Sequence, residues 1–191
     1  LGAAESAAAL IGGEAGLPVY LYGASARRPE TKELPDLRRG GLESLIRKAR
    51  AGLTPDFGPQ DINPHKGVVC VGARGPLIAF NVWLRTDVEI AAAIAEDVRR
   101  PQMLRALGLS IRSGLSQVSM NLLRPSELGI DPAYELVAAE AKGHNTEIVA
   151  TEIVGLVAQE WMPAATKQAA RRLCSPGRSI ESAISGRKTA I

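Results

Sequence analysis

The stretch TPDFGPQDINPHKGVVCVGARGPLIAFNVWL, residues 54–84, decides the fold expected for this protein. Prolines and glycines through its first half, as far as Gly67, prevent a helix or a strand from propagating. Two apolar runs rich in β-forming residues follow, Val68–Val71 and Leu77–Leu84. Because Arg74–Pro76 between them suits a tight turn, the sequence predicts a long loop that leads into an antiparallel hairpin.

The irregular part of this stretch, Asp56–Gly67, is the candidate ligand-binding loop. Loops of about 12 residues or more inside a compact domain are uncommon unless they bind a ligand or are disordered. Strongly structured sequence bounds this loop on both sides. The alternative is that its glycines and prolines only shape a connection between elements.

The rest of the chain carries regular periodicities that set the fold class. Upstream, the sequence predicts a helix over 1–15, a strand over 17–22 and a short amphipathic helix over 42–51. From 77 onward, strand, helix, strand, strand, helix and strand follow in order, at 77–84, 87–100, 104–111, 115–123, 132–144 and 147–151. This order is typical of a ferredoxin-like split βαβ domain, in the α/β (α+β) class, with both helices on one face of the sheet.

The composition excludes several classes of protein. With 191 residues, 46% of them hydrophobic and 23% charged, the chain is typical of a soluble globular protein. A net charge of +3 and 4% aromatic residues do not indicate a nucleic-acid partner. No apolar run is long enough for a membrane span and no signal peptide is evident, so we expect a cytoplasmic protein. Cys70 and Cys174 lack the spacing of a zinc site or a disulfide framework, and we expect no metal.

Several motifs in order and spacing resemble the formiminotransferase family of folate-dependent enzymes. They are Pro55–Pro59, Gly67, Gly72–Arg74 and Ile78–Asn81, with further matches at 17–26, 105–109, 117–122 and 152–157. The resemblance implies two similar α/β subdomains that face each other, with folate in a tunnel between them. It divides the chain into the end of the N-terminal subdomain (1–53), the loop or linker (54–67), the C-terminal subdomain (68–174) and a flexible tail (175–191), with a last helix over 161–173.

The resemblance also implies an activity. Family members are transferases that move a formimino group from N-formimino-L-glutamate to tetrahydrofolate, giving 5-formiminotetrahydrofolate and L-glutamate, in histidine degradation and one-carbon metabolism. Tetrahydrofolate is then a co-substrate and both partners are small molecules. The sequence leaves open whether the protein forms a homodimer and whether a cyclodeaminase domain is fused to it.

The resemblance places the catalytic histidine in a His-Pro-Arg motif of the first subdomain, and no such tripeptide occurs in these 191 residues. We expect that motif ahead of Leu1, and we expect this chain alone to be inactive. His65, in the loop, is either a proton donor or a solvated side chain, whereas His144 follows a helix and suits capping. The catalytic residue therefore stays unassigned.

The binding residues have more support. Residues 58–67 match the family segment that lines the folate site, and a preformed backbone of this kind allows close approach of a pterin ring. These residues are Gly58, Pro59, Gln60, Asp61, Ile62, Asn63, Pro64, His65, Lys66 and Gly67. Polar residues inside apolar strands need partners, which adds Asn81, Gln117, Ser119 and Asn121. Arg74 either neutralises a carboxylate or is an ordinary turn arginine, and the charged segment Arg27–Arg39 is either a solvated loop or a basic rim.

Two other functions compete with the enzyme. The first is a non-catalytic folate-binding or interaction module that lacks the catalytic histidine segment. The second is a ferredoxin-like structural domain without a ligand, which a mobile loop unable to bind folates would favour. The fold alone does not separate these functions.

Overall fold

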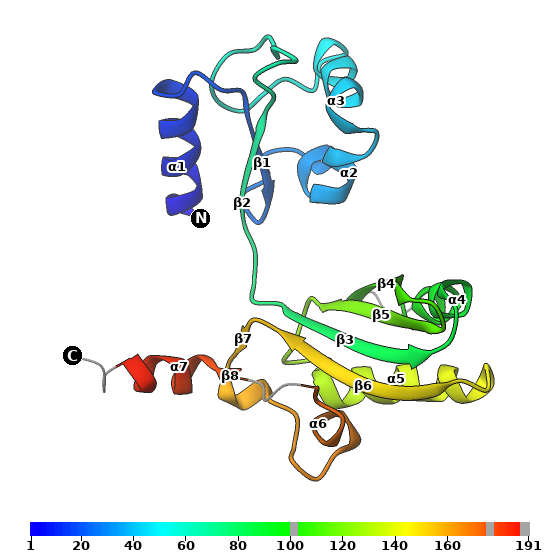
Figure 1. The fold of residues 1–191 in the computed structure, drawn as a ribbon. Helices are drawn as coiled ribbons and strands as arrows, with labels where there is room; N and C mark the ends of the chain where they lie inside the picture. The colour runs from blue at the N-terminus through cyan, green and yellow to red at the C-terminus, as the bar shows by residue number, and fades with distance from the viewer. Residues whose placement is uncertain (100–102, 175–177, 188–191) are drawn as a thin grey trace. The chain divides into compact units, whose positions relative to one another are not determined.

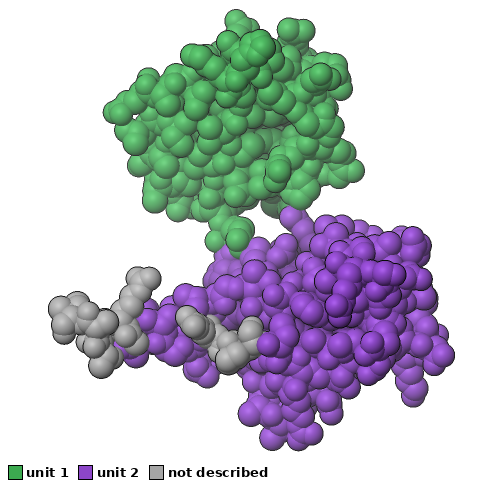
Figure 2. Space-filling view, viewed as in Figure 1, with its two compact units in different colours: residues 1–74 green, residues 75–191 purple. Residues whose placement is uncertain are grey.

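A computed structural model describes residues 1–99, 103–174 and 178–187. The chain divides into two compact units, Leu1–Arg74 and Gly75–Ile191 (Figures 1 and 2). Each unit is described here by itself. Within the described residues, no helix combines the length and the apolar character needed to cross a bilayer.

Unit 1 is built around two parallel strands. Its elements are α1 (Gly2–Gly13), β1 (Val19–Gly23), the 3₁₀ turn η1 (Pro29–Thr31), α2 (Leu34–Arg38), α3 (Gly41–Arg50) and β2 (Val69–Ala73). Strand β1 pairs with β2 in register from Val19 opposite Val69 to Gly23 opposite Ala73. The long connection between α3 and β2 contains the candidate loop, and it makes the parallel pairing possible.

The predicted hairpin between residues 68–71 and 77–84 is wrong, because β2 pairs with β1 and belongs to unit 1. Alternate side chains of β2 pack on opposite sides of the two strands. Val69 and Val71 pack against the cluster formed by Ala8, Val19 and Leu21, while Cys70 packs against a second cluster. A strand with apolar neighbours on both faces reads as a continuous apolar run, which is why its sequence resembled half of a hairpin.

Unit 2 confirms the predicted ferredoxin-like order. It contains β3 (Ile78–Arg85), α4 (Val88–Val98), β4 (Leu104–Arg112), β5 (Leu115–Leu122), α5 (Ile130–Gly143) and β6 (Glu147–Val154). The sheet order is β4-β5-β3-β6, and all neighbouring strands are antiparallel. The predicted elements therefore form within a few residues of their expected ends.

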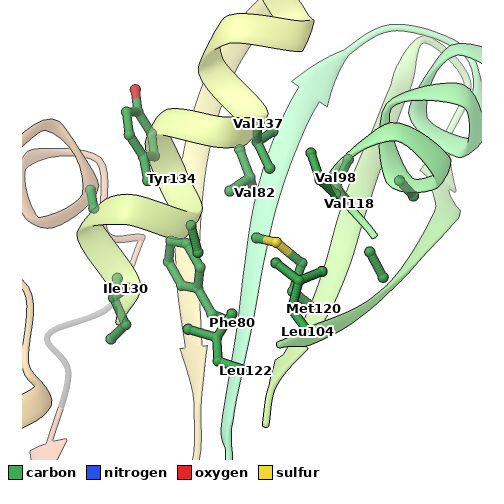
Figure 3. Close-up of a cluster of buried hydrophobic side chains, with 14 of the residues drawn as sticks. Phe80, Val82, Val98, Leu104, Val118, Met120, Leu122, Ile130, Tyr134 and Val137 are labelled. Carbon is green, nitrogen blue, oxygen red and sulfur yellow. The ribbon is translucent and has the colours of Figure 1, made fainter. Parts of the chain in front are cut away.

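The core of unit 2 lies between one face of this sheet and the helices α4 and α5. Phe80 and Val82 from β3 and Met120 from β5 lie against Val137 of α5 and Val98 of α4 (Figure 3). Close packing of α4 on β4 requires Gly108, since a Cβ atom there would lie 2.2 Å from the backbone nitrogen of Ala92. Because α4 and α5 both pack on one face of the sheet, the opposite face is left for other contacts.

The C-terminal part of unit 2 differs from the sequence expectation. The predicted helix over 161–173 is wrong: Pro163 interrupts it, and only η2 (Gln159–Trp161) and α6 (Gln168–Arg171) form. Of the predicted flexible tail, residues 175–177 and 188–191 lie outside the described residues. Within the rest, β8 (Arg178–Ser179) pairs with β7 (Leu156–Val157), and α7 (Ile180–Arg187) is helical.

Candidate functional site

The candidate loop in unit 1 begins at a partly buried ion pair. The Asp56 side chain is 4% exposed, and its Oδ1 accepts a hydrogen bond from Arg28 Nη2 at 2.8 Å. Asp56 Oδ2 accepts another from the backbone N–H of Leu21 at 2.8 Å, and Arg28 Nη2 also donates to the Thr54 carbonyl at 2.6 Å. These bonds fix the start of the loop to β1 and to the segment that follows it.

Gly58 is needed where the loop passes α1. Its φ is +78°, and a Cβ atom there would lie 2.2 Å from the Leu17 carbonyl oxygen and 3.1 Å from Gly12 Cα. A Cβ added at Gly12 would in turn lie 2.7 Å from the Gly58 nitrogen. Packing between two backbones therefore explains the glycine at 58 without any ligand.

The rest of the loop is anchored by one apolar side chain and one turn. Ile62 packs against the cluster of Tyr20, Leu37 and Leu45. The Asn63 carbonyl accepts hydrogen bonds from the backbone N–H groups of both Lys66 and Gly67. Between and around these anchors the loop is exposed, at Pro59, Gln60, Asp61, Asn63, Pro64, His65 and Lys66. The structure thus holds an exposed backbone platform in a defined shape.

A pocket of about 580 Å³ lies at the end of this loop, a volume typical of small-molecule sites. Gly67 is the one residue of the predicted binding set in its lining. Burial raises the pKa of the Cys70 thiol there, and the Arg38 guanidinium opposes that rise. The lining residues are Leu34, Leu37, Arg38, Gly41, Leu42, Leu45, Gly67, Val68 and Cys70.

The other predicted polar residues meet on the sheet of unit 2. We call the outer face the side chains that alternate with the core positions of its four strands. The strand register aligns these side chains in three neighbouring rows across the sheet. The middle row contains Leu107, Ser119, Asn81 and Glu152. The row on one side of it contains Leu109, Gln117, Trp83 and Ala150, and the row on the other side contains Arg105, Asn121, Ala79 and Val154. Four of the predicted residues, Asn81, Gln117, Ser119 and Asn121, thus share one surface.

The amides on this face differ in their environment. Asn81 is 6% exposed and donates from Nδ2 to Glu152 Oε2 at 2.9 Å, which confirms that its amide has a partner. Asn121 is exposed, so a ligand would have to supply the partner that the sequence predicts for its amide. Trp83 Nε1 is buried without a hydrogen-bond partner in the described residues. The outer face therefore combines a fixed polar pair with unused donors.

Both edge strands of the sheet, β4 and β6, carry accessible apolar side chains on the outer face. Leu107, Leu109 and Val154 are 60%, 42% and 52% exposed. Exposed apolar side chains that flank polar groups are characteristic of a binding surface. The arrangement suits a flat ligand that has both ring surface and hydrogen-bonding edges.

The remaining predicted residues are Arg74 and the two histidines. Arg74 is exposed at the end of unit 1, and His65 is exposed in the loop. His144 ends α5, where its backbone N–H donates to the Glu140 carbonyl at 3.0 Å. Within unit 1, His65 is not in the pocket lining, and within unit 2, His144 is not on the outer face.

Two family models match the chain in succession, and their division follows the two units. The formiminotransferase N-terminal subdomain model matches residues 1–74, and the formiminotransferase domain model matches residues 79–174. The chain belongs to the formiminotransferase family. This agrees with the resemblance carried by the motifs around Pro55–Pro59 and Ile78–Asn81.

Curated relatives are similar over most of this chain. The glutamate formimidoyltransferase of Streptococcus pyogenes is 35% identical over 75% of the chain, and that of Thermoplasma acidophilum is 35% identical over 78%. The formimidoyltransferase-cyclodeaminase of Sus scrofa is 38% identical over 75% of the chain. These matches cover 50%, 52% and 29% of the relatives, so the chain spans about half the length of the shorter ones.

Sequence reasoning missed several residues of the candidate loop region and of the outer face. It placed Arg28 in a surface segment, whereas the structure pairs this residue with buried Asp56. It also passed over Trp83 and Arg105, which alternate with core residues along β3 and β4. Strict two-residue alternation was the available signal, since it puts Trp83 on the same face as Asn81.

Proposed function

We propose that this chain is the folate-binding portion of a glutamate formimidoyltransferase. The enzyme would transfer the formimino group of N-formimino-L-glutamate to tetrahydrofolate, in the cytoplasm, as a step of histidine degradation. The observation that carries the proposal is the succession of both formiminotransferase models along one chain. The names of relatives at 35% identity support the same reaction.

Two surfaces are proposed as separate folate contacts, the exposed loop of unit 1 and the outer face of unit 2. A pterin ring offers flat surface and a hydrogen-bonding edge, which exposed backbone and amide side chains can recognise. Residues 58–67 would supply backbone groups, and Gln117 and Asn121 would supply amides. A folate also carries a glutamate carboxylate, which an arginine such as Arg74 or Arg105 would neutralise.

The chemistry requires a proton donor besides these contacts. The N5 amine of tetrahydrofolate attacks the formimino carbon, and the tetrahedral adduct then expels the glutamate amine. Expulsion of an amine needs a positioned acid, typically worth about 10² to 10⁴ in rate. His65 lies in the loop proposed to contact folate, but the resemblance does not require a histidine there, and His144 ends α5 and suits capping. We therefore assign the acid to the family's His-Pro-Arg segment, which residues 1–191 do not contain.

A non-catalytic folate-binding module is the second candidate, favoured by the lack of a His-Pro-Arg tripeptide in residues 1–191. Steady-state assays with formiminoglutamate and tetrahydrofolate separate the two functions. We expect turnover when a segment that carries the family's His-Pro-Arg motif precedes Leu1, and none from residues 1–191 alone. No turnover from either would favour the module, and equal turnover from both would show that the acid lies within residues 1–191.

A further inference from the structure

Three potential metal ligands meet where α4 and α5 end. Asp97 lies in the last turn of α4, Glu140 lies in the last turns of α5, and His144 caps α5. One ligand atom from each residue lies within 4.8 Å of the other two. Asp97 and Glu140 are half-buried and His144 is exposed, so the cluster is open to solvent.

The fold holds these three residues in place. Glu140 and His144 are four residues apart, which places them on the same side of α5. The backbone at the end of α5 is fixed, because the N–H of His144 donates to the Glu140 carbonyl and Asn145 adopts a left-handed φ of 50°. Helix α4 packs on α5 through core residues, which fixes the position of Asp97 relative to Glu140 and His144.

The ligand atoms of α5 are available. Within the part of the chain that the structure describes, neither the Glu140 carboxylate nor the His144 ring forms a side-chain hydrogen bond or an ion pair. Asp97 has a further interaction of its own, so the tests below change the other two residues. A hollow of about 440 Å³ lies beside Asp97 and is lined by Ala93, Glu96, Asp97 and Arg99.

We infer that Asp97, Glu140 and His144 bind a divalent cation of the zinc class. An imidazole together with two carboxylates suits Zn²⁺, Co²⁺ or Ni²⁺ better than Mg²⁺ or Ca²⁺, which prefer oxygen ligands alone. Ligands about 2.1 Å from a tetrahedral ion lie roughly 3.4 Å apart, so small side-chain rotations close the site. The two carboxylates balance the charge of the ion, and water completes its coordination.

Such an ion would link the ends of α4 and α5 and stabilise unit 2, because binding to the folded state alone shifts the folding equilibrium. The helices cover the face of the sheet opposite to the outer face. Metal binding should therefore leave the proposed folate contacts unchanged. The failure of this inference and the failure of the proposed function are then separate results.

Titration calorimetry with ZnCl₂ tests the site, in a Cys174→Ser background because that exposed thiol could also bind zinc. We expect one zinc per chain, and an affinity at least tenfold lower in Glu140→Gln and in His144→Asn. His65→Asn is the matched control, because this exposed loop histidine lies in the other unit and should leave the affinity unchanged.

Two further readouts distinguish lost ligands from lost folding. Circular dichroism without metal should give the same spectrum for all variants, and Zn²⁺ should raise the midpoint of thermal unfolding by several degrees only where Glu140 and His144 are present. Co²⁺ in place of Zn²⁺ should give visible d–d absorption that His144→Asn removes. A zinc dissociation constant of about 1 mM or weaker, or equal affinity in folded Glu140→Gln and His144→Asn, would overturn the inference.

Discussion

Asp56 and Arg28 form a partly buried ion pair of 2.8 Å at the start of the candidate loop, with side-chain exposures of 4% and 28%. The same carboxylate accepts the backbone N–H of Leu21 in β1. One aspartate thus joins the loop to the strand and to the charged segment after it. We therefore expect Asp56, the aspartate of the motif Pro55–Pro59, to stabilise unit 1.

Asp56→Asn should destabilise the protein by about 2 to 4 kcal/mol. The substitution leaves the Arg28 guanidinium without its charged partner in a largely buried position, where breaking a pair is costly. Urea denaturation followed by circular dichroism measures the change.

The matched control is the exposed pair of Arg39 and Asp36, whose side chains are 77% and 56% exposed. Arg39→Ala should change the free energy of unfolding by less than about 1 kcal/mol, because solvent screens surface pairs. Equal losses in Asp56→Asn and Arg39→Ala would contradict the role assigned to burial.

Gly58→Ala should destabilise the protein more than Gly67→Ala, although both glycines have a φ of +78°. The added Cβ meets the Leu17 carbonyl in the first case and nothing within 4 Å in the second. We expect about 1 kcal/mol for the strained φ at 67 and at least twice that at 58. Thermal unfolding of both variants measures the difference, and equal midpoints would show that the backbone contact does not matter.

Tyr20→Phe should remove a pH dependence of stability at alkaline pH. The Tyr20 hydroxyl donates to the Leu53 carbonyl at 2.7 Å, and burial raises its pKa from 10.0 to about 12. A raised pKa means that the folded state favours the neutral phenol. Its contribution is complete below pH 10 and is lost as the pH rises through about 12.

Unfolding free energies between pH 9 and 12 measure this effect as the difference between wild type and Tyr20→Phe. Below pH 10 the variant should be about 1 kcal/mol less stable, and above that pH the difference should shrink and then change sign, because ionisation of the buried phenol destabilises only the wild type. Tyr22→Phe, on the same strand, is the control. A constant difference over the whole range would contradict the assigned cause.

The sequence predicted the ferredoxin-like unit well because its strands and helices each have one apolar face. In β3, for example, Phe80 and Val82 alternate with Asn81 and Trp83, which defines both the strand and its core side. In β2 this signal is absent, since apolar neighbours lie on both faces. The turn residues at 74–76 therefore suggested a hairpin, whereas the parallel partner of β2 lies far back in the chain at β1.

Asn81→Ala should lower the stability of the protein, whereas Asn121→Ala should lower its affinity for folinate. Asn81 is buried and bonded to Glu152, so its loss should cost about 1 to 3 kcal/mol of stability. Asn121 is exposed, so its loss should change stability by less than about 0.5 kcal/mol and instead lower the affinity for folinate. Urea denaturation and calorimetry on the same samples give both quantities, and a large stability loss in Asn121→Ala would contradict this division.

The candidate site was predictable only in part. Polar residues in apolar strands identified Asn81 and Gln117, because alternation alone puts them on one face. The ligand cluster of Asp97, Glu140 and His144 has no local pattern, since packing of α4 on α5 brings together residues distant in sequence. The ion pair of Asp56 with Arg28 was hidden for the same reason.

Calorimetric titration with folinate, a stable tetrahydrofolate analogue, tests the central claim most directly. We predict saturable binding of one folinate per chain. Asn121→Ala should weaken this binding at least tenfold, with unfolding free energy unchanged. Absence of measurable binding at millimolar folinate, or the same affinity in wild type and in folded Asn121→Ala and Gln117→Ala variants, would contradict the claim that the outer face contributes to a folate site.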